Sequence, residues 1–459
     1  MNIDFNNLKN KKVTVMGLGL LGGGVEDVKW LVKKGAKVLV TDLKTKKELK
    51  ESLKKLKGLP VKYILGKHRE KDFRETDLII KNPAVPKKLK YLEIARKSGI
   101  LIESDLSLFF RLFKGRIIGV TGTKGKSTTV TLIAEIFKEA KKRFIFGGNI
   151  GQSPLADLDK NYPLAILELS SWQLEDLAYL KRSPEVAVIT TIFPDHLDRY
   201  RNFQEYIKAK KIIFKFQKKE DVLVLNYDNK ITRSFIKEVE SRVAYFSKGH
   251  LKNKNSVFVK GQVIVFRQNK KEKKIVSLKE IKHKYHLGNI LAAVSVACIF
   301  GIFPKIIKKV LKDLKGLPDR LELVRVLKGV KYYNDTTATV PEAAIFALKS
   351  LSRNRDIILI SGGADKKLNF EEFAQEVKKR CKAVILLPGT ATKNIKHQIS
   401  SIKYHLFFEV KNIREAVRKA ANFAQKHDIV LLSPGCASFG LFRNAYDRAK
   451  QFKKAVLSL

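Results

Sequence analysis

A glycine-rich turn lies between an apolar, strand-like run and a helical pattern near residue 120. The turn reads Gly122-Thr-Lys-Gly-Lys-Ser-Thr128, and the helical pattern extends over residues 126–140. Glycine lets a backbone approach an anion closely, and the free N–H groups at the start of a helix favour negative charge. A lysine there can reach the terminal phosphates of a nucleotide, and a serine can bind Mg²⁺. We therefore predict a nucleotide-phosphate site formed by Gly122, Thr123, Lys124, Gly125, Lys126, Ser127 and Thr128.

The spacing of this turn departs from the common phosphate loop, which places a glycine five residues before the position of Gly125. Val120 stands there instead. A chance succession of strand, glycine, lysine and helix is therefore the alternative to a nucleotide site.

Two further side chains could hold a cation beside such a site. Glu168 lies near the end of the apolar run 164–169, and ligands of open α/β sheets bind beyond the carboxyl ends of the strands. His196 lies between two aspartates and follows the apolar run 186–190. The alternatives are a solvated strand end for Glu168 and a structural role for His196, as is usual for an isolated histidine.

A second glycine-rich turn, Gly17-Leu-Gly-Leu-Leu-Gly22, follows a strand-like run close to the N-terminus. Asp42 ends the next apolar run, about 20 residues further on, which matches a dinucleotide-binding fingerprint. One such match is weak evidence, and it suggests a nicotinamide-dependent oxidoreductase as an alternative function. That alternative leaves the turn around Lys126 unexplained.

Apolar runs and helical patterns alternate in three stretches of the chain, which predicts α/β units with mainly parallel sheets. At roughly 150 residues per domain, 459 residues also suggest about three domains. We place these domains at residues 1–107, 108–315 and 316–459. Residues 256–268 have the pattern of a hairpin with Gly261 at its turn, and we expect the lysine-rich residues 269–274 to form an exposed loop.

The formal net charge is +47, with 92 Lys and Arg against 45 Asp and Glu. Such a charge could indicate a nucleic-acid or membrane partner, or an ATPase stimulated by nucleic acid. Because the lysines are spread along the whole chain, we interpret them as solvated side chains and expect no nucleic-acid partner. No apolar run reaches about 18 residues and the N-terminus is polar, so we expect no membrane segment or signal peptide. Three widely separated cysteines fit a reducing cytoplasm, and we expect a cytoplasmic monomer.

The form Thr121-Gly-Thr-Lys-Gly-Lys-Ser-Thr128 resembles the phosphate loop of the Mur ligases and the folylpolyglutamate synthases. These families share three domains and use ATP to activate a carboxylate. Further stretches resemble the same families in order: Gly147-Gly-Asn-Ile-Gly151, Leu167-Glu-Leu-Ser-Ser-Trp-Gln-Leu-Glu175, Asp195-His-Leu-Asp-Arg-Tyr200, Asn289 with Ala292-Ala293, and Gly316-Leu-Pro-Asp-Arg-Leu-Glu322. The resemblance covers nearly the whole chain, and a UDP-binding first domain favours the Mur ligases over the folate enzymes.

Within the Mur ligases, three stretches are similar to the members that join D-glutamate to UDP-N-acetylmuramoyl-L-alanine in peptidoglycan synthesis. They are Gly17–Gly22, Asn334-Asp-Thr-Thr-Ala-Thr339 and Leu432-Ser-Pro-Gly-Cys-Ala-Ser-Phe439. The resemblance implies a Rossmann-like UDP domain, a P-loop-like ATPase domain and a Rossmann-like C-terminal domain. It also implies ATP and Mg²⁺ as cofactors, an acyl-phosphate intermediate and closure of the third domain to deliver the amine.

The resemblance further implies roles for individual residues. The alternative is an ordinary interdomain polar contact for Asn149, Asn289, Arg320 and Asp335, and a solvated helix lysine for Lys210. The expected catalytic residues are Lys126, His196 and Lys210, the last as a carbamate and with Lys211 as the neighbouring candidate. The expected metal ligands are Ser127, Glu168, His196 and carbamylated Lys210. Beyond the glycine-rich turn, ATP is expected to contact Asn289, Arg320 and Asp335. The UDP substrate is expected to contact Leu20, Leu21, Asp42, Lys44, Asn82, Ala84 and Asn149. D-Glutamate is expected to contact Thr339, Lys366, Ser438 and Phe439.

Three residues depart from the pattern of the family. Thr337 stands where many members have lysine, His286 where asparagine is usual, and Ala445 where an aromatic residue is frequent. Thr337 and Ala445 fall where the incoming amino acid is expected. A sister ligase that adds a different amino acid therefore stays an alternative.

Overall fold

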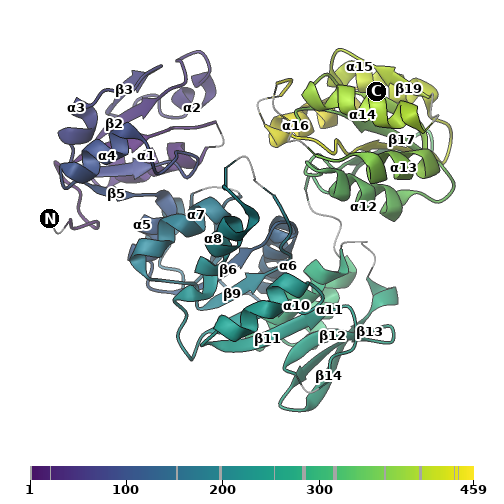
Figure 1. Cartoon of the computed structure of the whole chain (residues 1–459), viewed down its shortest axis with the longest axis horizontal. Coiled ribbons are helices and arrows are strands. Elements are labelled where there is room, and N and C mark those ends of the chain that lie inside the picture. Colours follow the sequence, from purple (N-terminus) through teal and green to yellow (C-terminus); the bar gives the residue numbers. More distant parts are fainter. Residues whose placement is uncertain are drawn as a thin grey trace. The chain divides into compact units, whose positions relative to one another are not determined.

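The chain folds into two compact units, Met1–Asp313 and Leu314–Leu459 (Figure 1). The computed structural model describes residues 3–20, 22–150, 153–195, 199–252, 254–281, 286–313, 318–365, 368–402, 406–438, 440–442 and 444–459. Two sheets lie in the first unit and one lies in the second, and all three are mainly parallel. The predicted α/β fold with three domains is therefore confirmed. Our proposal for the domain limits remains residues 1–107, 108–315 and 316–459.

The first sheet has the order β3-β2-β1-β4-β5, and its neighbouring strands are all parallel. The strands are β1 (Lys12–Met16), β2 (Lys37–Asp42), β3 (Val61–Leu65), β4 (Leu78–Lys81) and β5 (Leu101–Glu103). Valines alternate along β1 and β2 and pack on α1 (Gly23–Lys33), as expected for a sheet face that is covered by a helix. The strand order reverses between β1 and β4, so the loops after these strands diverge and leave room for a ligand. The other helices of this domain are α2 (Lys50–Lys54), α3 (Lys71–Arg74), α4 (Lys90–Lys97) and α5 (Asp105–Leu112).

The second sheet has the order β14-β13-β12-β11-β10-β9-β6-β8-β7. It is parallel from β7 to β12, and β13 and β14 extend it as an antiparallel ribbon. The strands are β6 (Arg116–Thr121), β7 (Ile145–Gly148), β8 (Leu164–Glu168), β9 (Val186–Ile189), β10 (Val222–Asn226), β11 (Arg242–Ser247), β12 (Ser256–Lys260), β13 (Val263–Gln268) and β14 (Lys271–Ser277). The helices are α6 (Lys126–Glu139), α7 (Ser171–Leu177), α8 (Phe203–Lys215), α9 (Lys230–Ser234), α10 (Leu287–Ile299) and α11 (Pro304–Asp313). Helices α6 and α10 pack against each other, which brings the start of α10 to the start of α6.

The ribbon at the edge of this sheet corrects one expectation. The predicted hairpin of β12 and β13 is confirmed, with Gly261 at its turn. Residues 269–274 were expected to form an exposed loop, but residues 271–274 belong to β14 and only Asn269 and Lys270 form a turn. The exposure of all six residues was predicted correctly. Asn269 and Lys270 both have positive φ, 50° and 66°, and a two-residue turn of that kind matches the twist of a hairpin. The lysine-rich run was misleading because its strand lies at a solvated edge, where lysine side chains are tolerated.

The third sheet has the order β15-β16-β20-β17-β18-β19, and β15 is antiparallel to its neighbour. Its strands are β15 (Glu322–Leu327), β16 (Val330–Asn334), β17 (Ile357–Ser361), β18 (Cys381–Leu386), β19 (Phe407–Glu409) and β20 (Ile429–Leu432). Apolar side chains from both faces of the central strands are buried, which explains their continuous hydrophobic runs. The helices are α12 (Pro341–Leu351), α13 (Glu371–Arg380), α14 (Thr390–Ser401), α15 (Ile413–Phe423) and α16 (Ala445–Leu457).

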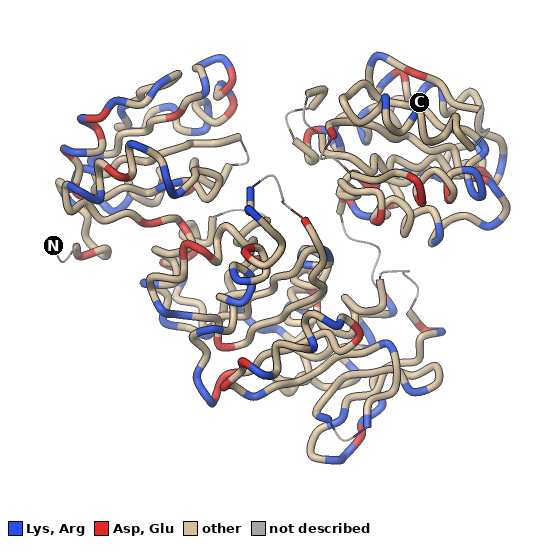
Figure 2. The backbone as a smooth tube through the Cα atoms, in the orientation of Figure 1, with Lys and Arg blue, Asp and Glu red and all other residues tan. Residues whose placement is uncertain are grey.

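Lysine and arginine residues occur along the backbone of both units in Figure 2. This distribution agrees with the interpretation of the positive charge as many separate solvated side chains. Across the residues that the structure describes, none of the helices combines the length and the apolar character needed to span a membrane.

Candidate functional site

The glycine-rich turn connects the carboxyl end of β6 to the start of α6, as predicted. Gly122 and Gly125 have φ values of +145° and +91°, and Gly125 is the residue that caps α6. A Cβ at Gly122 would collide with the Thr190 hydroxyl, and one at Gly125 would collide with Asn289 Oδ1. Both positions therefore need glycine for two reasons, the backbone conformation and the close approach of a neighbour.

Hydrogen bonds to the end of the adjacent strand β9 hold the turn in place. The backbone N–H of Thr123 donates to Thr191 O at 2.6 Å, and the Thr190 hydroxyl donates to Lys124 O at 2.6 Å. The Thr123 hydroxyl contacts the Tyr206 hydroxyl at 3.1 Å. The loop is thus preorganised before any ligand arrives, which lowers the entropic cost of binding.

Gly125→Ala is expected to weaken nucleotide binding by about tenfold or more, because a residue with a Cβ strains at this φ and displaces Asn289. Titration of the protein with ADP and ATP measures the effect. Gly261→Ala is the matched control, since Gly261 also has positive φ but has open space around it. Equal affinity in Gly125→Ala and the wild type would contradict the assignment of the loop.

Two lysines contact the same carbonyl of the turn. Lys126 Nζ donates to Gly122 O at 2.9 Å and to Thr123 O at 3.1 Å. Lys210 Nζ, from α8, donates to Gly122 O at 3.0 Å and to the Thr121 hydroxyl at 3.1 Å. This arrangement gathers two lysine side chains where a nucleotide's phosphates are expected.

Lys210 is only 2% exposed. Burial lowers the pKa of its ammonium well below the ordinary value, the charge of Lys126 lowers it further, and Glu168 and Asp195 oppose both effects. Lys211 points elsewhere and forms an ion pair with Glu238 at 2.5 Å. Of the two neighbouring candidates, the structure therefore brings Lys210 to the turn, and a lowered pKa favours the neutral amine that reacts with carbon dioxide.

Glu168 ends β8 at the same edge of the sheet and is 2% exposed. Its Oε1 accepts a hydrogen bond from Asn149 Nδ2 at 2.8 Å, whereas its buried Oε2 has no hydrogen-bond partner among the residues that the structure describes. A buried carboxylate oxygen without a partner is costly, and a hard divalent cation is a chemically suitable partner for it. Within the described ranges, no group of three or more acidic, histidine or cysteine side chains is placed to bind a metal, and His196 lies outside those ranges.

Asn289 lies 8% exposed in the first turn of α10, beside the backbone of Gly125. Its backbone N–H donates to His286 O at 2.8 Å. Asn289 was expected to contact ATP, and in the structure its side chain lies against Gly125 of the phosphate loop.

Of the residues expected at UDP, Asp42, Lys44, Asn82 and Ala84 lie at the carboxyl edge of the first sheet, whereas Asn149 follows β7 of the second sheet. Asp42 accepts hydrogen bonds from the backbone N–H groups of Gly19, at 3.2 Å, and Lys44, at 2.8 Å. Asn82 follows β4, lies against Gly17 and Gly19, and accepts a hydrogen bond from Ala84 N at 3.0 Å. Leu20 is exposed beside them, and Leu21 lies outside the described residues.

The C-terminal unit gathers a second set of predicted residues at the ends of β16 and β20. Asp335 accepts hydrogen bonds from the Ser433 hydroxyl at 2.8 Å and from Leu321 N at 3.2 Å. Burial raises the pKa of its carboxyl to about 6, and the charge of Arg320 opposes that rise. Thr339 and Ser438 lie on the loops that follow these two strands, while Lys366 and Phe439 lie outside the described residues.

Sequence reasoning missed two polar residues beneath these loops. Tyr206 is buried under the phosphate loop, four residues before Lys210 on α8, and that helical spacing could have linked the two. Arg448, fully buried on α16, donates to Thr336 O at 2.8 Å and to Cys436 O at 3.4 Å. Burial lowers the pKa of Arg448 to about 10. Nothing in the sequence distinguishes this arginine from the many other basic residues.

In the second sheet, the parallel strand β6 leads through a loop that contains glycine and lysine into helix α6. This arrangement is typical of the class of α/β proteins that bind nucleotide phosphates. Three family models match the chain in succession: the Mur ligase MurD-like N-terminal domain at residues 11–104, the Mur ligase middle domain at 120–297, and the Mur ligase glutamate ligase domain at 319–436. The protein therefore belongs to the Mur ligase family.

Curated relatives match over almost their whole length. A UDP-N-acetylmuramoylalanine–D-glutamate ligase of Roseiflexus sp. is 41% identical, covering 98% of this chain and 99% of that protein. The enzyme of the same name from Caldanaerobacter subterraneus is 37% identical, with 98% and 99% covered. Among solved structures, the UDP-N-acetylmuramate–alanine ligase of Thermotoga maritima matches with a TM-score of 0.66 at 19% identity, covering 98% of this chain and all of that one. That last likeness supports the fold.

Proposed function

We propose that this protein is an ATP-dependent ligase that joins D-glutamate to UDP-N-acetylmuramoyl-L-alanine in peptidoglycan precursor synthesis, with ADP and phosphate as further products. The observation that carries the proposal is the pair of lysines on the phosphate loop, Lys126 and Lys210, near the buried carboxylate of Glu168. The names of the two full-length bacterial relatives supply the substrates.

In this proposal the γ-phosphoryl group of ATP passes to the terminal carboxylate of the UDP substrate. The bond between the β- and γ-phosphates breaks as the acyl phosphate forms, and the amine of D-glutamate then attacks the acyl carbon. Phosphate leaves, the amine loses a proton, and an amide remains. Lys126 exchanges its contacts with two loop carbonyls for phosphate oxygens, and the N–H groups at the start of α6 offset the charge that develops.

Mg²⁺, when bound, would neutralise negative charge on the transferring group. We assign its ligands to Ser127, Glu168, His196 and carbamylated Lys210. The buried Oε2 of Glu168 supports this assignment because it has no hydrogen-bond partner within the described part of the chain. The low pKa of Lys210 supports the carbamate, because the neutral amine forms an N–C bond with carbon dioxide and releases a proton.

The remaining assignments follow the same division of the chain. We assign Leu20, Leu21, Asp42, Lys44, Asn82, Ala84 and Asn149 to the UDP substrate; Asn289, Arg320 and Asp335 to ATP; and Thr339, Lys366, Ser438 and Phe439 to D-glutamate. We also propose a cytoplasmic, monomeric enzyme, in keeping with its nucleotide substrates. Two assignments disfavour an oxidoreductase. The glycine-rich turn at Gly17 binds UDP in this proposal, so it does not require a nicotinamide cofactor. The loop around Lys126 binds the phosphates of ATP, a function that an oxidoreductase would leave unexplained.

Phosphate release tests the proposal directly. Purified protein receives ATP, Mg²⁺ and UDP-N-acetylmuramoyl-L-alanine, and each amino acid is added in turn. D-Glutamate is expected to stimulate phosphate release and to yield one new amide, identified by mass spectrometry. Release that proceeds equally without any amino acid would contradict ligation, and omission of the UDP substrate serves as the control.

A sister ligase that adds another amino acid is the second candidate. Thr337 favours this candidate, because many family members have lysine there, which offers a cation to the carboxylate of the amino acid. The Thr337 hydroxyl instead donates to Asp319 O at 3.0 Å. The small side chain of Ala445, at a position where an aromatic residue is frequent, also favours it. The same panel of amino acids decides between the two candidates, since a sister ligase would release phosphate with an amino acid other than D-glutamate.

A further inference from the structure

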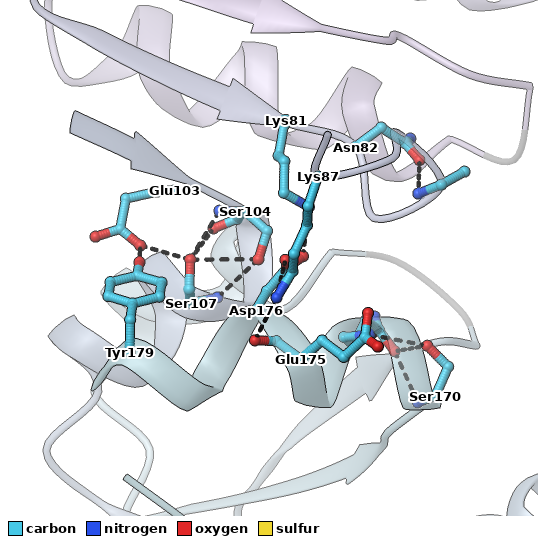
Figure 3. Close-up of polar contacts among 12 residues, drawn as sticks. Lys81, Asn82, Lys87, Glu103, Ser104, Ser107, Ser170, Glu175, Asp176 and Tyr179 are labelled. Atoms are coloured by element: carbon cyan, nitrogen blue, oxygen red, sulfur yellow. Dashed lines mark hydrogen bonds and ion pairs between the residues drawn. The ribbon is translucent and has the colours of Figure 1, made fainter. Parts of the chain in front are cut away.

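A buried ion pair joins the first two sheet domains, and the function proposed above leaves it unexplained. Lys81 ends β4 and Asp176 lies on α7, and Lys81 Nζ contacts Asp176 Oδ2 at 2.6 Å (Figure 3). Their side chains are 6% and 4% exposed. Lys87 adds to the contact, because its Nζ donates to Glu175 O at 2.8 Å and lies 3.8 Å from Asp176 Oδ1.

The two partners are directly connected to the two ends of the proposed site. Lys81 immediately precedes Asn82, which lies against Gly17 and Gly19 at the UDP edge. Helix α7 begins at Ser171, three residues after Glu168, and a capping box between Ser170 and Gln173 fixes its start. The ion pair therefore links the loop assigned to UDP with the helix that follows the carboxylate assigned to Mg²⁺.

A second bridge lies beside the first and comes from the next strand. Glu103 ends β5 and accepts a hydrogen bond from the Tyr179 hydroxyl, just after α7 (Figure 3). Arg111 also donates to Glu103, at 2.7 Å. The carboxyl edge of the first sheet is thus anchored to one short segment of the central domain, from α7 to Tyr179.

We propose that Lys81 and Asp176 are positioning residues that set the separation between the UDP-binding edge and the phosphoryl-transfer site. This inference rests on the proposed function, in which one substrate molecule binds with its nucleotide in the first domain and its reacting carboxylate in the second. Binding of the second end of such a molecule depends on how well the two sites are held at the matching distance. The strict geometry of a buried ion pair suits that task better than an adaptable apolar contact.

The double variant Lys81→Met/Asp176→Leu tests the inference. It removes both charges together, whereas a single substitution would leave one buried charge without a partner and could prevent folding. Calorimetric titrations measure the affinities for UDP, for ATP and for UDP-N-acetylmuramoyl-L-alanine, and steady-state rates give KM and kcat. UDP and ATP affinities are expected to stay within about twofold of the wild type, while affinity for the full substrate falls by about tenfold.

Asp159→Asn is the matched control, because Asp159 also joins the two domains. It forms ion pairs with Lys33, the last residue of α1, and with Lys34, the next residue, at 2.8 and 2.9 Å, and it is more exposed than Asp176. This variant is expected to bind all three ligands like the wild type.

The outcomes separate this inference from the function on which it rests. A wild-type protein that fails to bind or use UDP-N-acetylmuramoyl-L-alanine would overturn the proposed function and the inference with it. If the wild type is active, unchanged affinity of the double variant for the full substrate would overturn the positioning role alone. An equal loss of affinity for UDP and for the full substrate would also overturn it, because the pair would then only support the local UDP loop.

Discussion

Replacement of Lys126 by alanine is expected to lower ATP-dependent amide formation by about a thousandfold or more. Lys126 is the cation of the phosphate loop whose Nζ already lies against the backbone that would surround the phosphates. Removing one preorganised donor from such a site typically costs about 10²–10³ in rate, and this donor also carries a full charge. The measurement is phosphate release at saturating substrates, together with a titration of ATP.

Lys138→Ala is the matched control for Lys126→Ala. Lys138 belongs to the same helix, α6, but lies exposed in its last turn, so its loss is expected to leave the rate unchanged. Melting temperatures of both variants should stay close to that of the wild type. Substantial turnover in a folded Lys126→Ala variant would show that the phosphates bind elsewhere.

Lys210→Ala is expected to be inactive and to recover part of its activity when acetate or another short carboxylate is supplied. The substitution removes the amine that would form the carbamate and leaves a small cavity beside Gly122, into which an added carboxylate can bring the missing negative charge. Activity is measured across a series of carboxylate concentrations, with chloride at equal ionic strength as the comparison.

Lys211→Ala separates this role from a general effect of removing a lysine from α8. Lys211 pairs with Glu238, away from the phosphate loop, and its loss is expected to change activity little and to be insensitive to carboxylates. Wild-type activity of Lys210→Ala without any addition would remove the carbamate from the mechanism. If Lys210→Ala is inactive and no carboxylate restores its activity, the role of Lys210 would be that of an ammonium group that contacts Gly122 O.

The local chemistry of the sequence determined the phosphate loop and the strands around it. Gly122 and Gly125 have positive φ, Lys126 starts a helix, and β6 and β8 are continuous apolar runs, all of which depend on residues close together in the chain. Strands buried on both faces need apolar side chains, and a helix that follows a tight turn needs glycine before it. Such short-range requirements are visible in a single sequence. The motifs that indicated the family are also short stretches of sequence, so their order along the chain was sufficient to indicate it.

Other features depended on residues that only the tertiary structure brings together. Lys81 and Asp176 are 95 positions apart, and neither carries a local signal that it is buried. The choice of Lys210 over Lys211 depended on which face of α8 packs beneath the turn. Which oxygen of Glu168 has no partner among the described residues depended on where Asn149 donates its hydrogen bond. Residues 271–274 formed a strand because β13 was available as a neighbour. Burial, pKa shifts and pairing are properties of the assembled surroundings, so they were decided by the fold and could not be deduced from the spacing of residues along the chain.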